Sequence, residues 1–141
     1  MIRSLSLSLI LTLLLATPAG AAPLDKSKTR ARVMSCVLNS PARGYAIFEG
    51  MMNAHSEGEQ LAMRFELYVR RKGARTAFVR VPNVLGSWRR SNPGIVNFRF
   101  RERLEGLSAR VDYRARVTFR WLNRSELVSQ TVRRTGICRS G

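Results

Sequence analysis

Two cysteines, one histidine and a large excess of arginine carry most of the chemistry open to this sequence. The histidine, His55, stands close to Glu57 and Glu59. These three side chains could bind a divalent ion weakly, but a solvated polar turn is the interpretation we favour. Catalysis by acid–base or nucleophilic groups needs several convergent titratable side chains in a rigid frame. The sequence shows no such set, so we predict a non-enzymatic protein with no catalytic, metal-binding or cofactor-binding residues.

The start of the chain has the pattern of a secretory signal peptide. A single arginine is followed by an apolar run over residues 5–16, then by a proline and the small residues 19–21. The run is about 12 residues long, whereas roughly 20 are needed to span a bilayer. We predict a signal peptide over 1–21, cleaved after Ala21, with an uncleaved anchor as the alternative. Residues 22–29 are polar and are predicted to form a mobile tail.

The two cysteines, Cys36 and Cys138, lie near the two ends of the predicted mature chain. An even number of cysteines in an exported protein favours a disulfide. Two buried free thiols and a metal-binding pair are the alternatives, the latter a poor one because structural zinc sites use four ligands. The predicted mature chain contains no second long apolar segment and therefore no predicted transmembrane segment. We expect a secreted protein, extracellular or at the cell envelope.

From about residue 30 onward, apolar and polar residues alternate with the period of two expected for strands with one buried face. In the clearest case, 113–121, arginines and a threonine alternate with aromatic and small apolar residues. Glycine, proline and asparagine separate such segments at intervals typical of a β-sandwich. We predict one all-β domain over 30–139 with seven strands, at 31–38, 44–53, 60–71, 75–81, 95–104, 110–122 and 126–138.

The segment 104–117 resembles the region between strands E and F of fibronectin type III domains. In that family a leucine closes the loop and a tyrosine six residues later begins strand F, and Leu107 and Tyr113 have this spacing. The resemblance implies a tyrosine corner, in which the tyrosine hydroxyl bonds back to upstream backbone. It also implies a Greek-key β-sandwich of the immunoglobulin-like or fibronectin type III-like kind, with Leu107 and Tyr113 as fold-defining residues.

The predicted disulfide departs from antibody-type immunoglobulin domains, which pair cysteines of strands B and F beside a tryptophan of strand C. The whole predicted mature chain, including the segment 85–94, is similar to small exported immunoglobulin-like domains of actinobacteria. Those domains have no assigned activity, so this resemblance implies location and fold only.

Arginine dominates the charge of the chain. Lysine and arginine together number 25 against 9 acidic residues, and all but three of the basic residues are arginine. A GC-rich genome would produce such a bias. Selection for a fork-shaped donor that grips phosphate or carboxylate would produce it as well. Both explanations stay open at this point.

If the third, sixth and seventh predicted strands share a sheet, their outward arginines converge on one face. Such a face attracts polyanions largely independently of their detailed shape. Outside a cell these are anionic cell-wall polymers, acidic polysaccharides, anionic lipid headgroups and released DNA. Outward aromatic residues are few, so specific nucleic-acid recognition is not expected. The candidate contacts for an anionic ligand are Arg64, Arg70, Arg114, Arg116 and Arg120.

The function predicted from this face is binding or adhesion at the cell envelope. In the alternative, the charge only keeps the domain soluble. The domain would then be structural, bind a protein partner or inhibit a secreted enzyme.

A second candidate contact, Trp88 with Arg89 and Arg90, falls in the long connection before the fifth predicted strand. An aromatic residue beside two arginines could be a recognition hot spot. We favour a tryptophan that folds back to cap the end of the core with an arginine stacked on it.

Overall fold

The structure is a computed structural model that describes residues 29–141. The predicted signal peptide, 1–21, and residues 22–28 of the predicted tail lie outside the described residues. Thr29 belongs to strand β1 (Thr29–Val37) rather than to a tail, because its backbone pairs with Met52 and its side chain is buried. The first strand, predicted at 31–38, therefore begins two residues earlier and ends one residue earlier than predicted.

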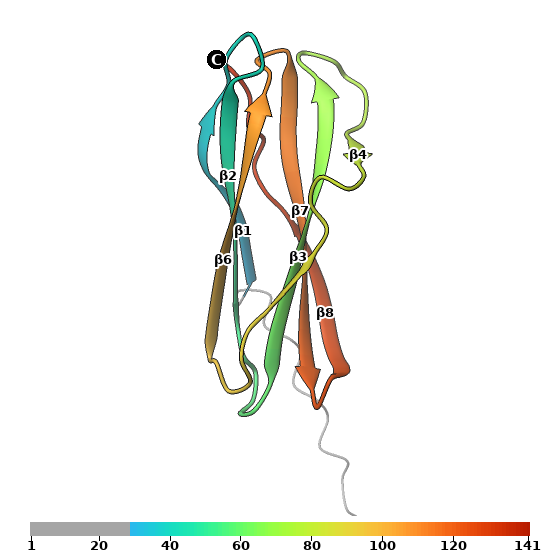
Figure 1. Cartoon of the computed structure of the whole chain (residues 1–141). Coiled ribbons are helices and arrows are strands. Elements are labelled where there is room, and N and C mark those ends of the chain that lie inside the picture. The colour runs from blue at the N-terminus through green and yellow to red at the C-terminus, as the bar shows by residue number, and fades with distance from the viewer. Residues whose placement is uncertain (1–28) are drawn as a thin grey trace, which may run out of the picture.

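All regular secondary structure in the described part is β, in two sheets that form a sandwich-like fold (Figure 1). The three-stranded sheet has the order β1-β2-β6. The five-stranded sheet has the order β4-β3-β7-β8, and the short β5 also pairs with β3. Within residues 29–141, no helix has the length and apolar character needed to cross a membrane. The remaining strands are β2 (Gly44–Asn53), β3 (Gln60–Arg71), β4 (Val79–Val81), β5 (Trp88–Arg90), β6 (Asn97–Leu107), β7 (Val111–Asn123) and β8 (Glu126–Arg134).

The predicted strands at 44–53 and 60–71 are confirmed at both ends. The predicted fourth strand is shorter, since the chain turns away from the sheet at Gly73, whose φ of 74° suits glycine, and rejoins it only at Val79. The predicted last strand ends early as well, at Arg134. At this point the hydroxyl of Thr135 accepts a hydrogen bond from the backbone N–H of Ala115. In a continuous ladder, that N–H would donate to a backbone carbonyl instead.

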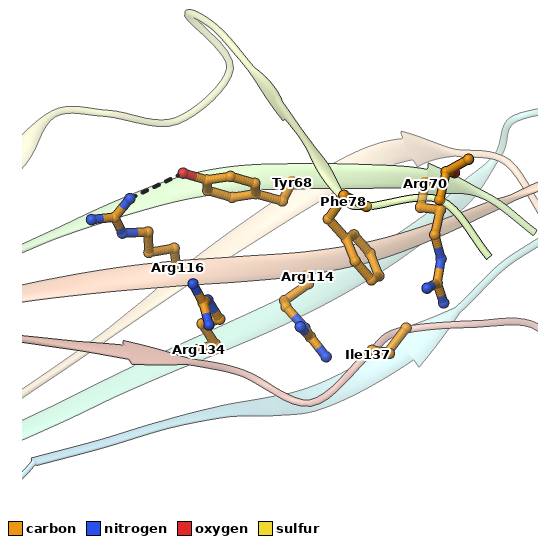
Figure 2. Close-up of a pocket in the computed structure, with 9 residues that line it drawn as sticks. Tyr68, Arg70, Phe78, Arg114, Arg116, Arg134 and Ile137 are labelled. Carbon is orange, nitrogen blue, oxygen red and sulfur yellow. Dashed lines mark hydrogen bonds between the residues drawn. The ribbon is translucent and has the colours of Figure 1, made fainter. Parts of the chain in front are cut away.

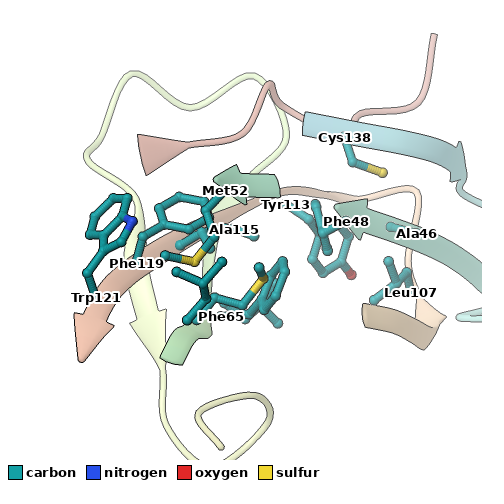
Figure 3. Close-up of a cluster of buried hydrophobic side chains, with 14 residues drawn as sticks. Ala46, Phe48, Met52, Phe65, Leu107, Tyr113, Ala115, Phe119, Trp121 and Cys138 are labelled. Atoms are coloured by element: carbon teal, nitrogen blue, oxygen red, sulfur yellow. The ribbon is translucent and has the colours of Figure 1, made fainter. Parts of the chain in front are cut away.

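The core lies between the two sheets, and the alternation of β7 supplies much of it. Five alternate residues of that strand are buried: Tyr113, Ala115, Val117, Phe119 and Trp121. They meet Phe48 and Met52 of the opposite sheet, with Trp121 near one end of the core and Leu107 near the other (Figure 3). Each large apolar side chain buried in this way stabilises the fold by about 1.5–3 kcal/mol.

A disulfide joins Cys36 of β1 to Cys138, which follows β8, so the predicted pairing is confirmed. The two Cα atoms are 5.5 Å apart and the cysteines are separated by 102 residues. Cys138 is fully buried, and a backbone bridge also pairs it with Tyr113 of β7. The disulfide and this backbone bridge together connect the first strand to the end of the chain and to the centre of the five-stranded sheet.

Leu107 and Tyr113, on either side of the turn between β6 and β7, are both buried. The Tyr113 hydroxyl accepts a hydrogen bond of 2.9 Å from the backbone N–H of Ser108. A bond from this hydroxyl to upstream backbone is what the resemblance of segment 104–117 implied. It anchors the turn that carries the chain from one sheet to the other.

Candidate functional site

The outer face of the five-stranded sheet brings together all five arginines that were predicted to share a face. They come from β3 and β7, which pair along their whole length at the centre of the sheet. Their neighbours along each strand point into the core, so the arginines point away from it. We call this surface the arginine face and define it by Arg64, Arg70, Arg114, Arg116 and Arg120.

Two aromatic rings lie over the arginine face and contact four of its guanidinium groups. The ring of Trp88 is 5.0 Å from the guanidinium carbon of Arg64 and 4.2 Å from that of Arg120. The ring of Phe78 lies 4.5 Å from Arg70 and 4.8 Å from Arg114. Such contacts contribute about 0.5–2 kcal/mol each. The arginines are consequently half-buried and held in place, rather than surrounded by water as the alternation alone predicts.

Glu66 of β3 neutralises part of the charge at the centre of the face. Its side chain is only 6% exposed, so its carboxylate depends on nearby positive charge. The nearest guanidinium is that of Arg80 at 3.1 Å, followed by Arg64 at 3.8 Å and Arg116 at 3.9 Å. One carboxylate is therefore shared among three arginines, which leaves an excess of positive charge around it.

Asp112 of β7 has the same role at one end of the face. This side chain is 2% exposed and lies 3.0 Å from Arg70 and 3.9 Å from Arg139. Two of the arginines that remain, Arg114 and Arg134, contact no carboxylate within residues 29–141. With Arg120, which bonds to the uncharged Gln130, these guanidinium groups leave an excess of positive charge along β7 and β8.

Arg116 and Arg134 lie directly opposite each other in the β7–β8 ladder. Like charges in this position repel and destabilise the pairing. Arg116 also donates a hydrogen bond of 3.3 Å to the Tyr68 hydroxyl. That bond raises the pKa of Arg116 above its usual value, and the charge of Glu66 acts in the same direction against the effect of burial. Arg116 stays protonated throughout the physiological range.

A cavity of about 390 Å³ opens between these groups (Figure 2). Its size is within the roughly 300–1,000 Å³ typical of ligand pockets. Side chains from β3, β7, β8 and the segment before β4 line it together with Ile137, which follows β8. The lining groups that bear on function are Arg70, Arg114, Arg116, Arg134, Tyr68 and Phe78.

Arg134 was not among the predicted contacts, although it belongs to this pocket. The sequence places it in the last strand, but its nearness to Arg116 depends on the register between β7 and β8. That register includes an irregularity between Trp121 and Leu122, which no alternation pattern reveals. Phe78 was missed because the chain around it was predicted to be regular strand.

The prediction for Trp88, Arg89 and Arg90 is correct in one respect and wrong in another. Arginines do stack on Trp88, but the ring covers the sheet face rather than the end of the core, because β5 pairs with β3 and sets Trp88 opposite Arg64. The guanidinium group of Arg89 instead forms an ion pair with the carboxylate of Glu102, at 3.0 Å. Arg90 is exposed. The register places Trp88 opposite Arg64 and Arg90 opposite Ala62, so both lie on the side of the sheet that carries the arginine face, whereas Arg89 does not.

The end of the core is covered by His55, whose ring stacks on Trp121 at 4.3 Å. Glu59 is buried beside it and accepts hydrogen bonds from the backbone N–H groups of His55 and Ser56, at 2.7 and 3.2 Å. Glu57 is exposed. Among the described residues, no group of three or more histidine, cysteine or acidic side chains is arranged to hold a metal ion. The turn that contains them is accounted for by packing and hydrogen bonds.

The outer face of the three-stranded sheet differs, because most of its arginines pair closely with carboxylates. Glu49 is 1% exposed and bonds to Arg32 and Arg101, each at 2.8 Å. Burial raises the pKa of Glu49, but the bonds and charges of Arg101 and Arg32 outweigh burial and hold that pKa below its usual value. Arg103 bonds to Glu105 at 2.7 Å. Arg30 and Arg99 also lie on this side of the sheet and contact no carboxylate within residues 29–141. The two faces therefore differ in how closely their paired arginines bond to carboxylates, not in the number of unpaired ones.

No protein-family model matches the chain, and no curated protein matches it in sequence. Among solved structures, β-glucuronidase 2 of Bacteroides uniformis, covalently bound to cyclophellitol-6-carboxylate aziridine, aligns with 77% of this chain at 12% identity and a TM-score of 0.40. The aligned part is 13% of that enzyme chain, so this chain spans a small fraction of its length. A protein from Archaeoglobus fulgidus aligns with 80% of this chain and 95% of its own, at 9% identity and a TM-score of 0.37.

Proposed function

We propose that this chain is an exported, non-enzymatic binding module that contacts anionic polymers of the cell envelope through the arginine face. The observation that carries the proposal is the gathering of half-buried, aromatic-stacked arginines on one sheet face, with more guanidinium than carboxylate groups. Guanidinium forks match the oxygens of phosphate, sulfate and carboxylate groups. Their restraint by Trp88 and Phe78 reduces the side-chain entropy lost on binding.

The fold we propose for this module is an immunoglobulin-like or fibronectin type III-like Greek-key sandwich. Three features support it: the division of the strands into β1-β2-β6 and β4-β3-β7-β8, the antiparallel pairing, and the bond from Ser108 to Tyr113. Export is supported by the signal-peptide pattern of residues 1–21 and by the Cys36–Cys138 disulfide.

The test is the salt dependence of polymer binding, measured on the oxidised protein with heparin and with poly(glycerol phosphate). Binding through released counterions weakens steeply with salt, by nearly one log unit per log of salt for each phosphate neutralised on a duplex. We expect a steep slope and a clear loss of affinity in a variant with Arg64→Gln and Arg120→Gln.

The matched control is a variant with Arg43→Gln and Arg99→Gln, which removes the same charge from exposed positions off the arginine face. It should weaken binding much less. Equal weakening by both variants would mean that net charge alone matters, and the face would have no special role. Absence of binding to either polymer would leave a structural or protein-partner role for the domain.

A further inference from the structure

The pocket at the Phe78 end of the arginine face is a defined cavity, whereas binding of polyanions by charge alone needs only a positively charged surface. We infer that it binds one tetrahedral oxyanion, a phosphoryl or sulfate group carried on the polymer, between Arg114 and Arg134. This inference rests on the proposed function and names the group that the face recognises. Three observations support it: donors that lack an acceptor, a like-charge pair that Glu66 offsets only weakly, and guanidinium groups from three neighbouring strands that line one pocket.

Three of the arginines that line the pocket have a buried Nε–H without an acceptor in the structure: Arg70, Arg114 and Arg116. Buried donors are almost always hydrogen-bonded, so each exception needs an explanation such as a bound water or ion. Arg114 lacks the most hydrogen-bond partners of the three, because its guanidinium stacks on Phe78 but forms no hydrogen bond or ion pair with any described residue. A bound anion would supply the acceptors that this cluster lacks.

The second observation is the pairing of Arg116 with Arg134 across β7 and β8. Two guanidinium groups in directly opposite positions repel each other. Glu66 offsets this only weakly, because it lies 3.9 Å from Arg116 and closer to Arg80. An anion bound in the adjoining pocket would attract both guanidinium groups and so offset the repulsion between them.

The arrangement fits a tetrahedral oxyanion better than a planar carboxylate. Guanidinium groups from three neighbouring strands line the pocket, with Arg70 on β3, Arg114 and Arg116 on β7, and Arg134 on β8 (Figure 2). The Tyr68 hydroxyl, which accepts a bond from Arg116, keeps its own O–H as a further donor. A phosphoryl or sulfate group offers three or more oxygens in different directions, whereas a carboxylate offers two in one plane.

The experiment titrates the folded, oxidised protein with inorganic phosphate, sulfate and acetate, following affinity by calorimetry or by NMR. Phosphate and sulfate should bind about tenfold more tightly than acetate, as expected for one or more extra bonds to charged donors. Preference for phosphate would point to a phosphate-bearing wall polymer, and preference for sulfate to a sulfated polysaccharide. Acetate binding as tightly as phosphate, or no binding of phosphate, would overturn the inference.

Two variants locate the site. Arg134→Gln removes an exposed guanidinium, and Arg114→Lys keeps the charge but loses the fork. Each should weaken phosphate binding by about tenfold, while Arg99→Gln changes it less than about twofold. Thermal unfolding of each variant verifies that it is folded. If Arg114→Lys unfolds, the exposed Arg134→Gln alone decides the matter.

Failure of this inference can be told apart from failure of the proposed function. If the wild-type protein binds polymer with a steep salt slope, but Arg134→Gln and Arg99→Gln weaken that binding equally, the pocket has no special role and the face proposal stands. If phosphate binds in the pocket but neither heparin nor poly(glycerol phosphate) binds the protein, the polymer function fails and the oxyanion site stands.

Discussion

The hydroxyl of Tyr113 accepts a 2.9 Å hydrogen bond from the backbone N–H of Ser108, five residues earlier in the chain. The ring is buried in the core, while the hydroxyl reaches the turn between β6 and β7. This single bond therefore couples the packing of the core to the path of the chain between the sheets.

Tyr113→Phe should lower the free energy of unfolding by about 1–2 kcal/mol, because it leaves the Ser108 N–H without its acceptor while preserving the ring. Equilibrium urea denaturation measures the change. Tyr45→Phe is the matched control, since the Tyr45 ring stacks against Arg103 and its hydroxyl bonds to no other described residue. Equal effects of the two substitutions would show that the turn does not depend on the Tyr113 hydroxyl.

Glu49 makes stability depend on pH in the acid range. Its pKa in the folded protein is lowered from 4.5, despite burial, by Arg101 and Arg32. Its contribution to stability is therefore complete above the unfolded-state pKa and is lost as the pH falls through the folded-state value. Urea denaturation at stepped pH values between neutrality and strong acid should show a loss of stability that begins near the unfolded-state pKa.

In the variant Glu49→Gln that part of the pH dependence should disappear, and stability at neutral pH should fall by about 1–3 kcal/mol because two guanidinium groups lose a charged acceptor. The half-exposed positions of Arg32 and Arg101 allow them to turn to water, which limits the loss. Glu105→Gln, at an exposed carboxylate, is the control and should keep the wild-type pH profile. An unchanged profile in Glu49→Gln would assign the acid loss to other carboxylates.

Reduction of the Cys36–Cys138 disulfide should lower the stability by about 2–4 kcal/mol, because the bond closes a loop of about 100 residues and restricts the unfolded chain. The double variant Cys36→Ala with Cys138→Ala should match the reduced wild-type protein. The measurement is urea denaturation with and without reductant. Stability that does not respond to reductant would contradict the prediction.

His55 contributes to stability by stacking on Trp121. His55→Ala should destabilise the protein by about 0.5–1.5 kcal/mol beyond the loss of buried area, and the fluorescence of Trp121 should change. The control in the same turn is Glu57→Ala, which is exposed and should have little effect on either measurement. Equal, small effects in thermal unfolding would mean that the stack does not support this end of the core.

The β architecture could be predicted from sequence because burial and period two coincide along the long strands. In β3 and β7, alternate residues are apolar for many positions, so their inner and outer faces could be assigned without a structure. Alternation cannot identify strands as short as three residues. β5 has three residues, two of them arginines, and its pairing with β3 depends on tertiary contact rather than on pattern.

The candidate site was predicted only in part, because some of its residues meet through tertiary contacts rather than through alternation along one strand. The arginines of β3 and β7 follow from alternation, whereas Arg134 joins them through a register that the sequence does not encode locally. The covering rings of Phe78 and Trp88 come from a segment that returns over the sheet after turns. Their presence turns a solvated charged face into a restrained one with a pocket.

The measurement that tests the central claim most directly is an NMR titration of the ¹⁵N-labelled, oxidised protein with poly(glycerol phosphate), following backbone amides and arginine Nε–H signals. We predict that the largest shifts fall on β3, β7 and β8 and on the side chains of Arg114 and Arg116. If the largest shifts instead fall on β1, β2 and β6, or no signal moves at low salt, the arginine face is not the binding surface.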